Sequence, residues 1–222
     1  MHYAGKQSFL ASDDKLLFLE QQLRTEGFVF IAGVDEAGRG PLAGPVVAAA
    51  VIFPEGAKIP AVRDSKQLSE QEREELSAAI RAVEGIRFAV VESSVEMIDQ
   101  WNILRANDRA MREALLQVAP VDLALVDGRP VPGLPCPSRA IVKGDAKCAS
   151  IAAASILAKV HRDQIMMDLD KEYPDYGFAE HKGYGTAAHL DALRRLGPTP
   201  AHRKSFAPVR QLLDPMEQGE LF

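Results

Sequence analysis

The chain has 222 residues, of which 47% are hydrophobic and 26% are charged. This length suits one substantial domain, and the apolar content is enough for a buried core, which excludes a chain that is disordered throughout. No run of about 18 uncharged apolar residues occurs, and the N-terminus lacks the pattern of a secretory signal. Cys136 and Cys148 are not spaced like metal ligands or a disulfide framework. We therefore expect a cytoplasmic protein with no membrane partner.

The net charge of −5 is unevenly distributed along the chain. Residues 1–138 carry 14 basic and 20 acidic side chains, whereas residues 139–210 carry 12 basic and 8 acidic ones. The later segment is thus cationic within an acidic protein. Because a basic face can bind phosphate groups, the overall charge does not exclude a nucleic-acid partner.

The first half of the chain predicts helices and an antiparallel strand pair. A short helix is expected at 13–22, with Ser12 as its N-cap. Two apolar, β-branched runs at 28–35 and 45–53 are separated by the glycine-rich AGRGPLAG, which favours adjacent antiparallel strands. The spacing of Ser69 and Glu72 is that of a capping box, so a helix is predicted over 70–83.

The second half continues the alternation of strands and helices. After a strand at 86–92, a helical stretch begins at Ser94, breaks near Trp101–Asn102 and ends at Pro120. The remaining predicted elements are a buried strand at 123–127, a proline-rich loop, a short strand at 139–143, a long alanine-rich helix at 149–170 and a final helix at 187–196. This order predicts an α/β fold with a mixed sheet.

Acidic residues follow three of the predicted strands. Asp35 and Glu36 follow FVFIAGV, Asp127 follows LALV, and Asp145 follows IVKG. A single such residue is commonly a turn former or a helix cap, but several at one sheet edge favour a metal site, because a buried carboxylate needs a partner. Oxygen ligands without His or Cys favour Mg²⁺ or Mn²⁺ over zinc, and four carboxylates suit two ions. Since neighbouring strand residues face opposite ways, Asp35 and Glu36 can share a site only if the strand ends or bulges there.

Five motifs, taken in order, resemble the motif series of bacterial type 2 ribonuclease H (ribonuclease HII). They are GVDEAGRGPLAGPVVAAAV at 33–51, DSKQLS at 64–69, LVDG at 125–128, KGDAKCASIAAASILAKVHRD at 143–163 and HKGYGT at 181–186. The resemblance implies a ribonuclease H-like fold, with a central mixed sheet flanked by helices and a helical C-terminal portion. It divides the chain into an N-terminal helical extension (1–27), a catalytic domain (28–210) and a C-terminal tail (211–222).

The same resemblance implies an endonuclease that hydrolyses the RNA strand of RNA–DNA hybrids. It also implies cleavage 5′ of single ribonucleotides in duplex DNA, leaving 5′-phosphate and 3′-hydroxyl ends, and hence a role in removing ribonucleotides from DNA. Asp35, Glu36, Asp127 and Asp145 are implied to hold two Mg²⁺ or Mn²⁺ ions. Asp163 also matches a family position, and its alternative role is an ion pair with Lys159 one turn earlier.

Substrate-reading residues are implied as well. An enzyme that separates RNA from DNA must sense the 2′-hydroxyl, and the backbone of Gly38, Arg39 and Gly40 is implied to do so, because glycine allows close approach. A tight hairpin turn is the alternative for these residues. Tyr184 is similar to the family tyrosine that packs on the sugar of the next nucleotide, although a loop tyrosine also commonly packs on a core. Ser65, Lys66, Lys143 and Lys182 are candidate phosphate contacts, although each of them alone is more commonly a solvated side chain.

The C-terminal QGELF is similar to short peptides by which bacterial replication and repair proteins dock on the DNA sliding clamp. Gln218, Leu221 and Phe222 would be its anchors, and the alternative is a tail folded back on the core. The enzyme itself is expected to be a monomer. Two other functions stay open at this point. One is a nuclease or strand-transfer enzyme of the same fold acting on DNA, which would not need a 2′-hydroxyl reader. The other is a non-catalytic nucleic-acid or clamp adaptor, which would not need the four acids.

Overall fold

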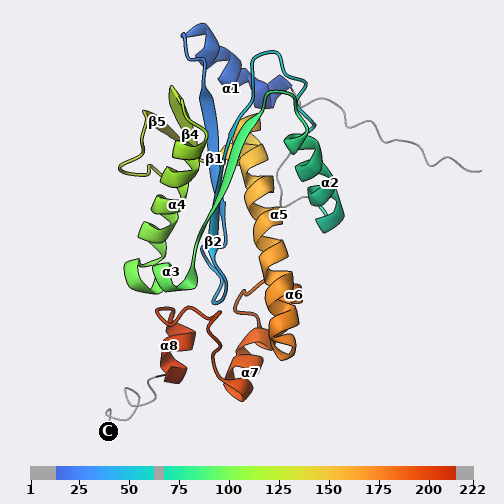
Figure 1. Ribbon diagram of the computed structural model, residues 1–222, viewed down its shortest axis with the longest axis vertical. Helices are drawn as coiled ribbons and strands as arrows, with labels where there is room; N and C mark the ends of the chain where they lie inside the picture. The colour runs from blue at the N-terminus through green and yellow to red at the C-terminus, as the bar shows by residue number, and fades with distance from the viewer. Residues whose placement is uncertain (1–13, 63–67, 214–222) are drawn as a thin grey trace, which may run out of the picture.

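The computed structural model describes residues 14–62 and 68–213, and it is built around a five-stranded mixed sheet in the order β3-β2-β1-β4-β5 (Figure 1). The strands are β1 (Ile31–Ala37), β2 (Val46–Ile52), β3 (Arg87–Ser93), β4 (Leu123–Asp127) and β5 (Ser138–Ile141). β2 pairs antiparallel with β1 and β3, whereas β4 pairs parallel with β1 and β5. The predicted mixed sheet and the predicted antiparallel pair are therefore confirmed.

Helices cover both faces of the sheet (Figure 1). On one face, α4 (Ile103–Gln117) buries Ala110, Met111 and Leu115 against the even-numbered side chains of β1 and β2. On the other face lies α5 (Ala149–Glu172), whose first half is alanine-rich and buried. Its backbone approaches β1 so closely that a Cβ at Gly33 would overlap the backbone of Ser150 and Ile151. This close approach explains why small residues occur in both elements.

Two shorter helices show the predicted capping box and the predicted helix break. α2 (Glu70–Arg81) begins at Ser69, and the reciprocal bonds of the capping box with Glu72 are both present. α3 (Val95–Trp101) ends at Asn102, which has a positive φ of 71° and caps α4 through its side-chain oxygen. Asn102 therefore forms the break that was predicted near Trp101–Asn102. Within the described ranges, none of the helices combines the length and the apolarity needed to cross a membrane.

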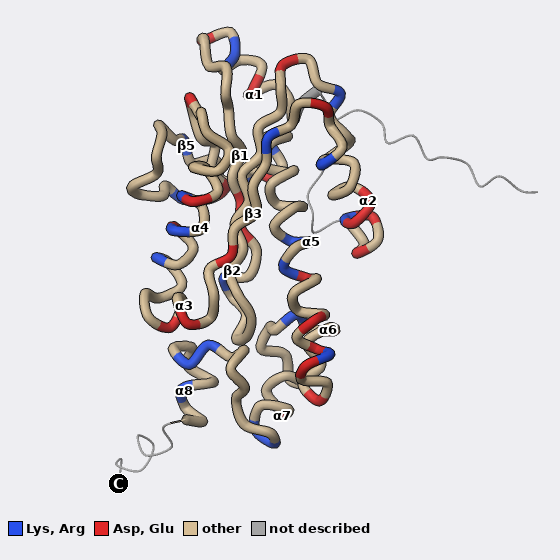
Figure 2. Tube along the Cα trace, viewed as in Figure 1, with Lys and Arg blue, Asp and Glu red and all other residues tan. Residues whose placement is uncertain are grey.

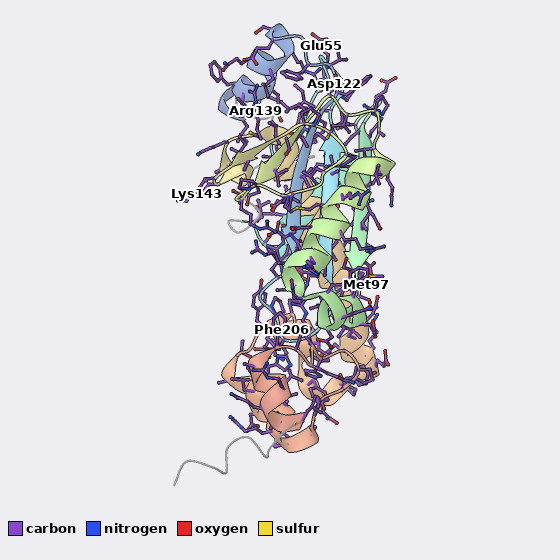
Figure 3. The ribbon with its side chains drawn as sticks, turned by 90° about the vertical axis from the view of Figure 1, so that its left-hand side faces the viewer. Glu55, Met97, Asp122, Arg139, Lys143 and Phe206 are labelled. Carbon is purple, nitrogen blue, oxygen red and sulfur yellow. The ribbon has the colours of Figure 1, made fainter. Side chains whose placement is uncertain are left out.

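The C-terminal helices gather at one end of the sheet (Figure 1). They are α6 (Phe178–His181), α7 (Ala187–Leu196) and α8 (Ala207–Leu213), and with Leu42, Ala43 and Met166 they form a separate apolar cluster. The bounds of α7 match the prediction, but its place as the final helix was wrong, because α8 follows it and runs three residues beyond position 210. Phe206, just before α8, lies between the sheet and these helices (Figure 3).

At the opposite end of the sheet lies α1 (Asp14–Thr25). Its Leu23 is fully buried with Ile31 and Ile151, and Glu20 reaches the first turn of α5. There the Glu20 Oε1 accepts hydrogen bonds from the backbone N–H of Ser150 at 2.8 Å and from the Ser150 hydroxyl at 2.5 Å. Because the first amides of a helix lack partners within the helix, Glu20 acts as a distant cap for α5. The predicted N-cap of α1, Ser12, lies outside the described residues.

Candidate active site

A cavity of about 580 Å³ opens where β1 and β4 end, next to α5. Its lining residues are Asp35, Glu36, Ala37, Gly38, Arg39, Gly40, Arg73, Ile103, Asp127, Ser155, Lys159, Arg162 and Tyr184. Seven of these residues were predicted as site residues from the sequence: Asp35, Glu36, Gly38, Arg39, Gly40, Asp127 and Tyr184. These seven come from three separate motifs, at 33–51, 125–128 and 181–186. Figure 2 shows acidic positions within the central strands beside basic positions on the adjoining part of α5.

Asp35 and Asp127 are neighbours because of the strand register. Val34 of β1 pairs in parallel with Val126 of β4, and both valines pack on the α4 face. Side chains alternate along a strand, so the next residue on each strand, Asp35 and Asp127, faces α5 instead. There the carboxylate of Asp35 receives hydrogen bonds from the Ser155 hydroxyl and from the backbone N–H of Glu36, the latter at 2.7 Å. That of Asp127 accepts the backbone N–H of Gly144 at 2.6 Å.

Glu36 reaches the same cavity without a distortion of the strand. β1 pairs with β2 in regular register and ends at Ala37, so the expected strand end just after Glu36 is confirmed and the alternative, a bulge, does not occur. Glu36 lines the cavity from the other face of β1, because the cavity opens at the end of the strand. Its Oε1 accepts a hydrogen bond from Arg39 at 2.9 Å. Two adjacent acids on one strand can therefore contribute to one site at a sheet edge.

The electrostatic surroundings of Asp35 are unfavourable to its charge. Burial raises the pKa of Asp35 well above its usual value, and the carboxylates of Glu36 and Asp127 raise it further, against the lowering effect of its two hydrogen bonds. Within residues 14–62 and 68–213, no three His, Cys, Asp or Glu side chains are already gathered as a metal-binding cluster. A buried carboxylate with two acidic neighbours is nevertheless a setting that a hard divalent cation would stabilise.

Other predicted residues lie outside this cavity. Asp145 is 5% exposed in the 3₁₀ turn η2 (Gly144–Ala146) and does not line the cavity, although the N–H of the residue before it binds Asp127. Lys143 has a positive φ of 55° and is exposed at the outer edge of the molecule beside β5 (Figure 3). Two sets of predicted residues lie outside the described ranges. They are Ser65 and Lys66, which precede α2 in the sequence, and Gln218, Leu221 and Phe222 near the C-terminus.

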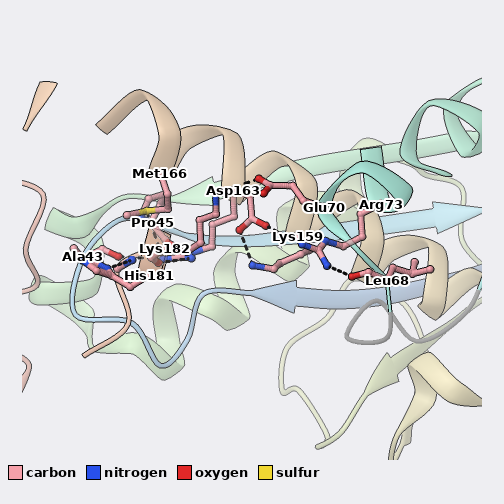
Figure 4. A network of polar contacts seen from close by, with 12 residues as sticks. Ala43, Pro45, Leu68, Glu70, Arg73, Lys159, Asp163, Met166, His181 and Lys182 are labelled. Carbon is pink, nitrogen blue, oxygen red and sulfur yellow. Dashed lines mark hydrogen bonds and ion pairs between the residues drawn. The ribbon is translucent and has the colours of Figure 1, made fainter. Parts of the chain in front are cut away.

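Ion pairs connect α2 with α5 and with the loop after α6 (Figure 4). Asp163 is 4% exposed and accepts Lys159 Nζ at 2.6 Å, which is the ion pair that the spacing predicts. Arg73 of α2 lies 3.8 Å from the same carboxylate. Lys182 forms an ion pair with Glu70 at 3.1 Å. Arg73 and Lys159 therefore bring positive charge to the cavity lining from two helices.

Two buried arginines hold the segment 38–45, here called the GRG loop. Arg203 donates to the carbonyls of Gly38 at 2.6 Å, Arg39 at 3.1 Å, Gly44 at 2.9 Å and Pro45 at 3.1 Å. It is fully buried, and burial together with the nearby Arg162 guanidinium lowers the pKa of Arg203 to about 9. The planar guanidinium satisfies several carbonyls at once, which a lysine ammonium cannot do with the same geometry.

Arg162 of α5 performs a similar function from the other side. It donates to Pro45 at 3.1 Å, to Ala43 at 3.1 Å and to the carbonyl of Lys182 at 3.0 Å, so it joins the GRG loop to the segment that carries Tyr184 (Figure 4). The sequence analysis missed both arginines. The sequence gives a weak indication for Arg162, because an arginine that follows the buried alanines on the same helix is itself expected to be buried. No neighbouring residue gives such an indication for Arg203.

The comparisons with known proteins identify the family of the chain. The sequence profile of the family described as Ribonuclease HII matches residues 32–209. The chain is 52% identical over 200 residues to Ribonuclease HII of Chlamydia pneumoniae, covering 89% of this chain and 92% of that protein. It is 56% identical over 188 residues to Ribonuclease HII of Rhodospirillum rubrum, covering 82% and 86%.

Solved structures give the same result at lower identity. The ribonuclease H2 of Pyrococcus horikoshii superposes with a TM-score of 0.70 at 26% identity, covering 86% of this chain and all of that one. The ribonuclease HII in a complex with PCNA from Archaeoglobus fulgidus gives 0.68 at 28% identity, covering 80% and 95%. Bst-RNase HIII, solved in complex with Mn²⁺, shares the fold alone, with a TM-score of 0.59 at 19% identity and coverage of 86% and 71%. The chain therefore belongs to the ribonuclease HII family, and it is an endonuclease with ribonuclease HII activity on RNA–DNA hybrids.

Proposed function

We propose that this enzyme, besides acting on hybrids, cuts on the 5′ side of single ribonucleotides in duplex DNA and leaves 5′-phosphate and 3′-hydroxyl ends. The observation that carries the proposal is the shared lining of one cavity. Carboxylates Asp35 and Asp127, the backbone of Gly38–Gly40 and the ring of Tyr184 all face the same space. A single phosphodiester bound in this cavity would therefore contact the acidic residues, while its flanking sugars would contact the GRG backbone and Tyr184.

The carboxylates would hold Mg²⁺ or Mn²⁺, two ions per site, and the donor set fits such ions. Asp35, Glu36 and Asp127 offer hard oxygen ligands, with Asp145 as the fourth member implied by the family motifs. When bound, the ions supply positive charge that offsets these acids and the charge that develops on the phosphate. Ser155 orients Asp35 and the Gly144 amide orients Asp127, so the protein fixes both carboxylates before a substrate arrives.

The GRG loop is suited to reading a ribose. A Cβ at Gly40 would meet only the Tyr184 ring, at 3.6 Å, so the space beside this glycine is bordered by the aromatic ring. The ring is 48% exposed, which leaves a face free for a sugar. Because Arg203 fixes the carbonyls of the loop from behind, the backbone facing the cavity is rigid. A rigid backbone next to an aromatic ring can distinguish a 2′-hydroxyl from a deoxyribose by close fit.

The test maps the cut in a DNA duplex with one ribonucleotide, with Mg²⁺ and Mn²⁺ in turn, beside an all-DNA duplex. We expect a single cut 5′ of the ribonucleotide and none in the control. Asp127→Asn should abolish cleavage while duplex binding and far-UV circular dichroism are retained, and Asp191→Asn, which changes an exposed acid on α7, should act like wild type. Cleavage of the all-DNA duplex, or full activity of Asp127→Asn, would contradict the proposal.

We further propose that Gln218, Leu221 and Phe222 dock the enzyme on the DNA sliding clamp. The support is the QGELF sequence itself and the PCNA complex of the Archaeoglobus fulgidus relative. Deleting 218–222 should remove clamp capture in a pull-down and leave hydrolysis of a short hybrid unchanged. Replacement of Leu221 and Phe222 by alanine should have the same effect, whereas Glu220→Ala should not. Clamp capture that survives both changes would end this proposal.

A further inference from the structure

Three histidines lie close to the backbone of Tyr184 without lining the cavity, and the proposed function uses none of them. His189 of α7 and His202 are fully buried, and His181 of α6 is half-buried. The Nε2 atoms of His189 and His202 are 3.0 Å apart, and the rings of His181 and His189 stack at 4.3 Å. Phe178 packs against all three rings. The three are here called the histidine cluster.

The partners of the cluster determine where each proton lies. At one end, the backbone N–H of Thr199 donates to His202 Nδ1 at 2.9 Å, so this nitrogen carries a lone pair and the ring proton is on Nε2. At the other end, the carbonyl of Tyr184 can only accept, so His189 carries its proton on Nδ1, 2.9 Å away. The lone pair on His189 Nε2 then accepts the Nε2–H of His202. One arrangement of protons on two neutral rings satisfies all three contacts.

A second proton on either ring would break this arrangement. On His189 it would place two N–H groups against each other at the 3.0 Å contact with His202, and on His202 it would place a ring N–H against the Thr199 N–H at 2.9 Å. Burial, and the neighbouring His189, lower the pKa of His202 to about 4, and burial lowers the pKa of His189 as well. His181, the third ring, accepts the Gly183 N–H on Nδ1 at 3.2 Å and faces the Tyr176 carbonyl with Nε2 at 2.7 Å. His189 and His202 are therefore both neutral near neutral pH.

The Tyr184 carbonyl is one of three consecutive carbonyls that are fixed from behind. That of Lys182 accepts from Arg162 at 3.0 Å, and that of Gly183 accepts from the Leu42 N–H at 2.8 Å. The backbone here is left-handed at Lys182 (φ 50°) and at Gly183 (φ 80°), a conformation that is costly for lysine. The surrounding contacts must hold this turn in place, and the imidazole of His189 supplies the side-chain contact at Tyr184 itself.

We propose that His189 and His202 are positioning residues, which hold Tyr184 over Gly40 through a relay of neutral imidazoles and thereby set selectivity for the sugar next to the cut. The selectivity rests on the proposed function of Tyr184 given above. The relay runs from the Thr199 amide through both rings to the Tyr184 carbonyl. Its effect is to restrict where the ring can lie, because a loop fixed at its backbone leaves the side chain only its own rotamers.

The first test is a ¹⁵N spectrum of the histidine rings in the intact wild-type protein at neutral pH. We expect His202 as the Nε2–H form and His189 as the Nδ1–H form, both neutral. Free imidazole side chains favour the Nε2–H form, so the assignment at His189 is diagnostic. A His189 ring that carries its proton on Nε2, or that is charged, would overturn the relay.

The second test separates positioning from simple stabilisation through a double-mutant cycle. His202→Leu should lower kcat/KM about tenfold on a duplex with one ribonucleotide, but less than threefold when Tyr184→Ala is already present. His202→Gln retains a donor near the Nε2 position and should restore most of the loss. His161→Leu, at a half-buried residue of α5 outside the cluster, is the matched control and should act like wild type.

The outcomes are distinguishable. Equal losses in both backgrounds would show that His202 only stabilises the fold and would overturn its positioning role. If Tyr184→Ala itself leaves the preference for the single ribonucleotide unchanged, the proposed role of Tyr184 fails, and the ¹⁵N spectrum still decides whether the relay exists. Thermal midpoints of all variants are measured alongside, and a variant that does not fold leaves the decision to the same spectrum.

Discussion

Arg203→Met is the substitution with the most calculable effect on the GRG loop. Methionine is similar in length but donates no hydrogen bond, so the carbonyls of Gly38, Arg39 and Gly44 lose their guanidinium donor, while that of Pro45 keeps the one from Arg162. A buried carbonyl without a partner costs about 1–3 kcal/mol. Three of them, relieved in part by entering water, amount to roughly 3–5 kcal/mol.

We expect this cost to appear mainly as disorder of the loop and therefore as lost cleavage. The assay is kcat/KM on a hybrid and on a single-ribonucleotide duplex, with thermal unfolding alongside. We expect a loss of roughly 100-fold or more, since each 1.4 kcal/mol is a factor of ten. Arg203→Lys keeps the positive charge but loses the planar guanidinium that donates to several carbonyls at once, so an intermediate loss of kcat/KM is expected. Arg195→Met, at a residue 60% exposed, is the control. Unchanged activity and an unchanged midpoint in Arg203→Met would refute the reasoning.

Three other changes test separate features. Asp35→Asn should abolish cleavage yet stabilise the metal-free protein by about 1 kcal/mol, because it removes a buried charge beside two acids; a lower midpoint in EDTA would contradict this. In the same melts, Mg²⁺ should raise the midpoint of the wild type and not of Asp35→Asn. Gly33→Ala should destabilise by about 1–3 kcal/mol, since its Cβ would overlap the backbone of α5, and a neutral urea midpoint would show that the contact can relax. Finally, the pKa of His202 is lowered from 6.5 to about 4, so the unfolded chain takes up a proton between these values that the folded protein does not. Stability should therefore fall as pH drops from 6.5 to 4, by roughly 3 kcal/mol, and His202→Gln should flatten that part of the urea-midpoint profile.

Several elements could be predicted closely because local chemistry marks their ends. β4 is Leu123–Asp127 as expected, since the short apolar run Leu123–Val126 lies between the breakers Pro120 and Gly128. α7 is Ala187–Leu196, with the Thr186 cap at its start and Gly197 after its end. In each case the boundary residue acts through its own backbone or its own short side chain, so no distant contact is needed.

Other features depend on distant partners and could not be predicted. β1 continues through Asp35 and Glu36 to Ala37 because β2 supplies its hydrogen bonds, although acidic residues seldom favour a strand. α8 is a single short helix that includes Pro208, and the sequence analysis missed it.

The candidate site shows the same division. Its acids and glycines stand out in the motifs, and their common cavity follows from the strand register. Arg162 and Arg203 bind backbone carbonyls, and a carbonyl has no signature in the sequence, so their role needed the three-dimensional arrangement.

The contact between Glu20 and Ser150 has a practical consequence for anyone who shortens this chain. The family profile matches from residue 32 onward, so a chain trimmed to the bounds of that profile would lack Glu20 and leave the Ser150 amide at the start of α5 to water. That helix carries Ser155 and Arg162 into the cavity. The bounds of the profile are therefore a poor guide to where the chain can be cut, and a truncated protein that folds poorly would say nothing against its chemistry.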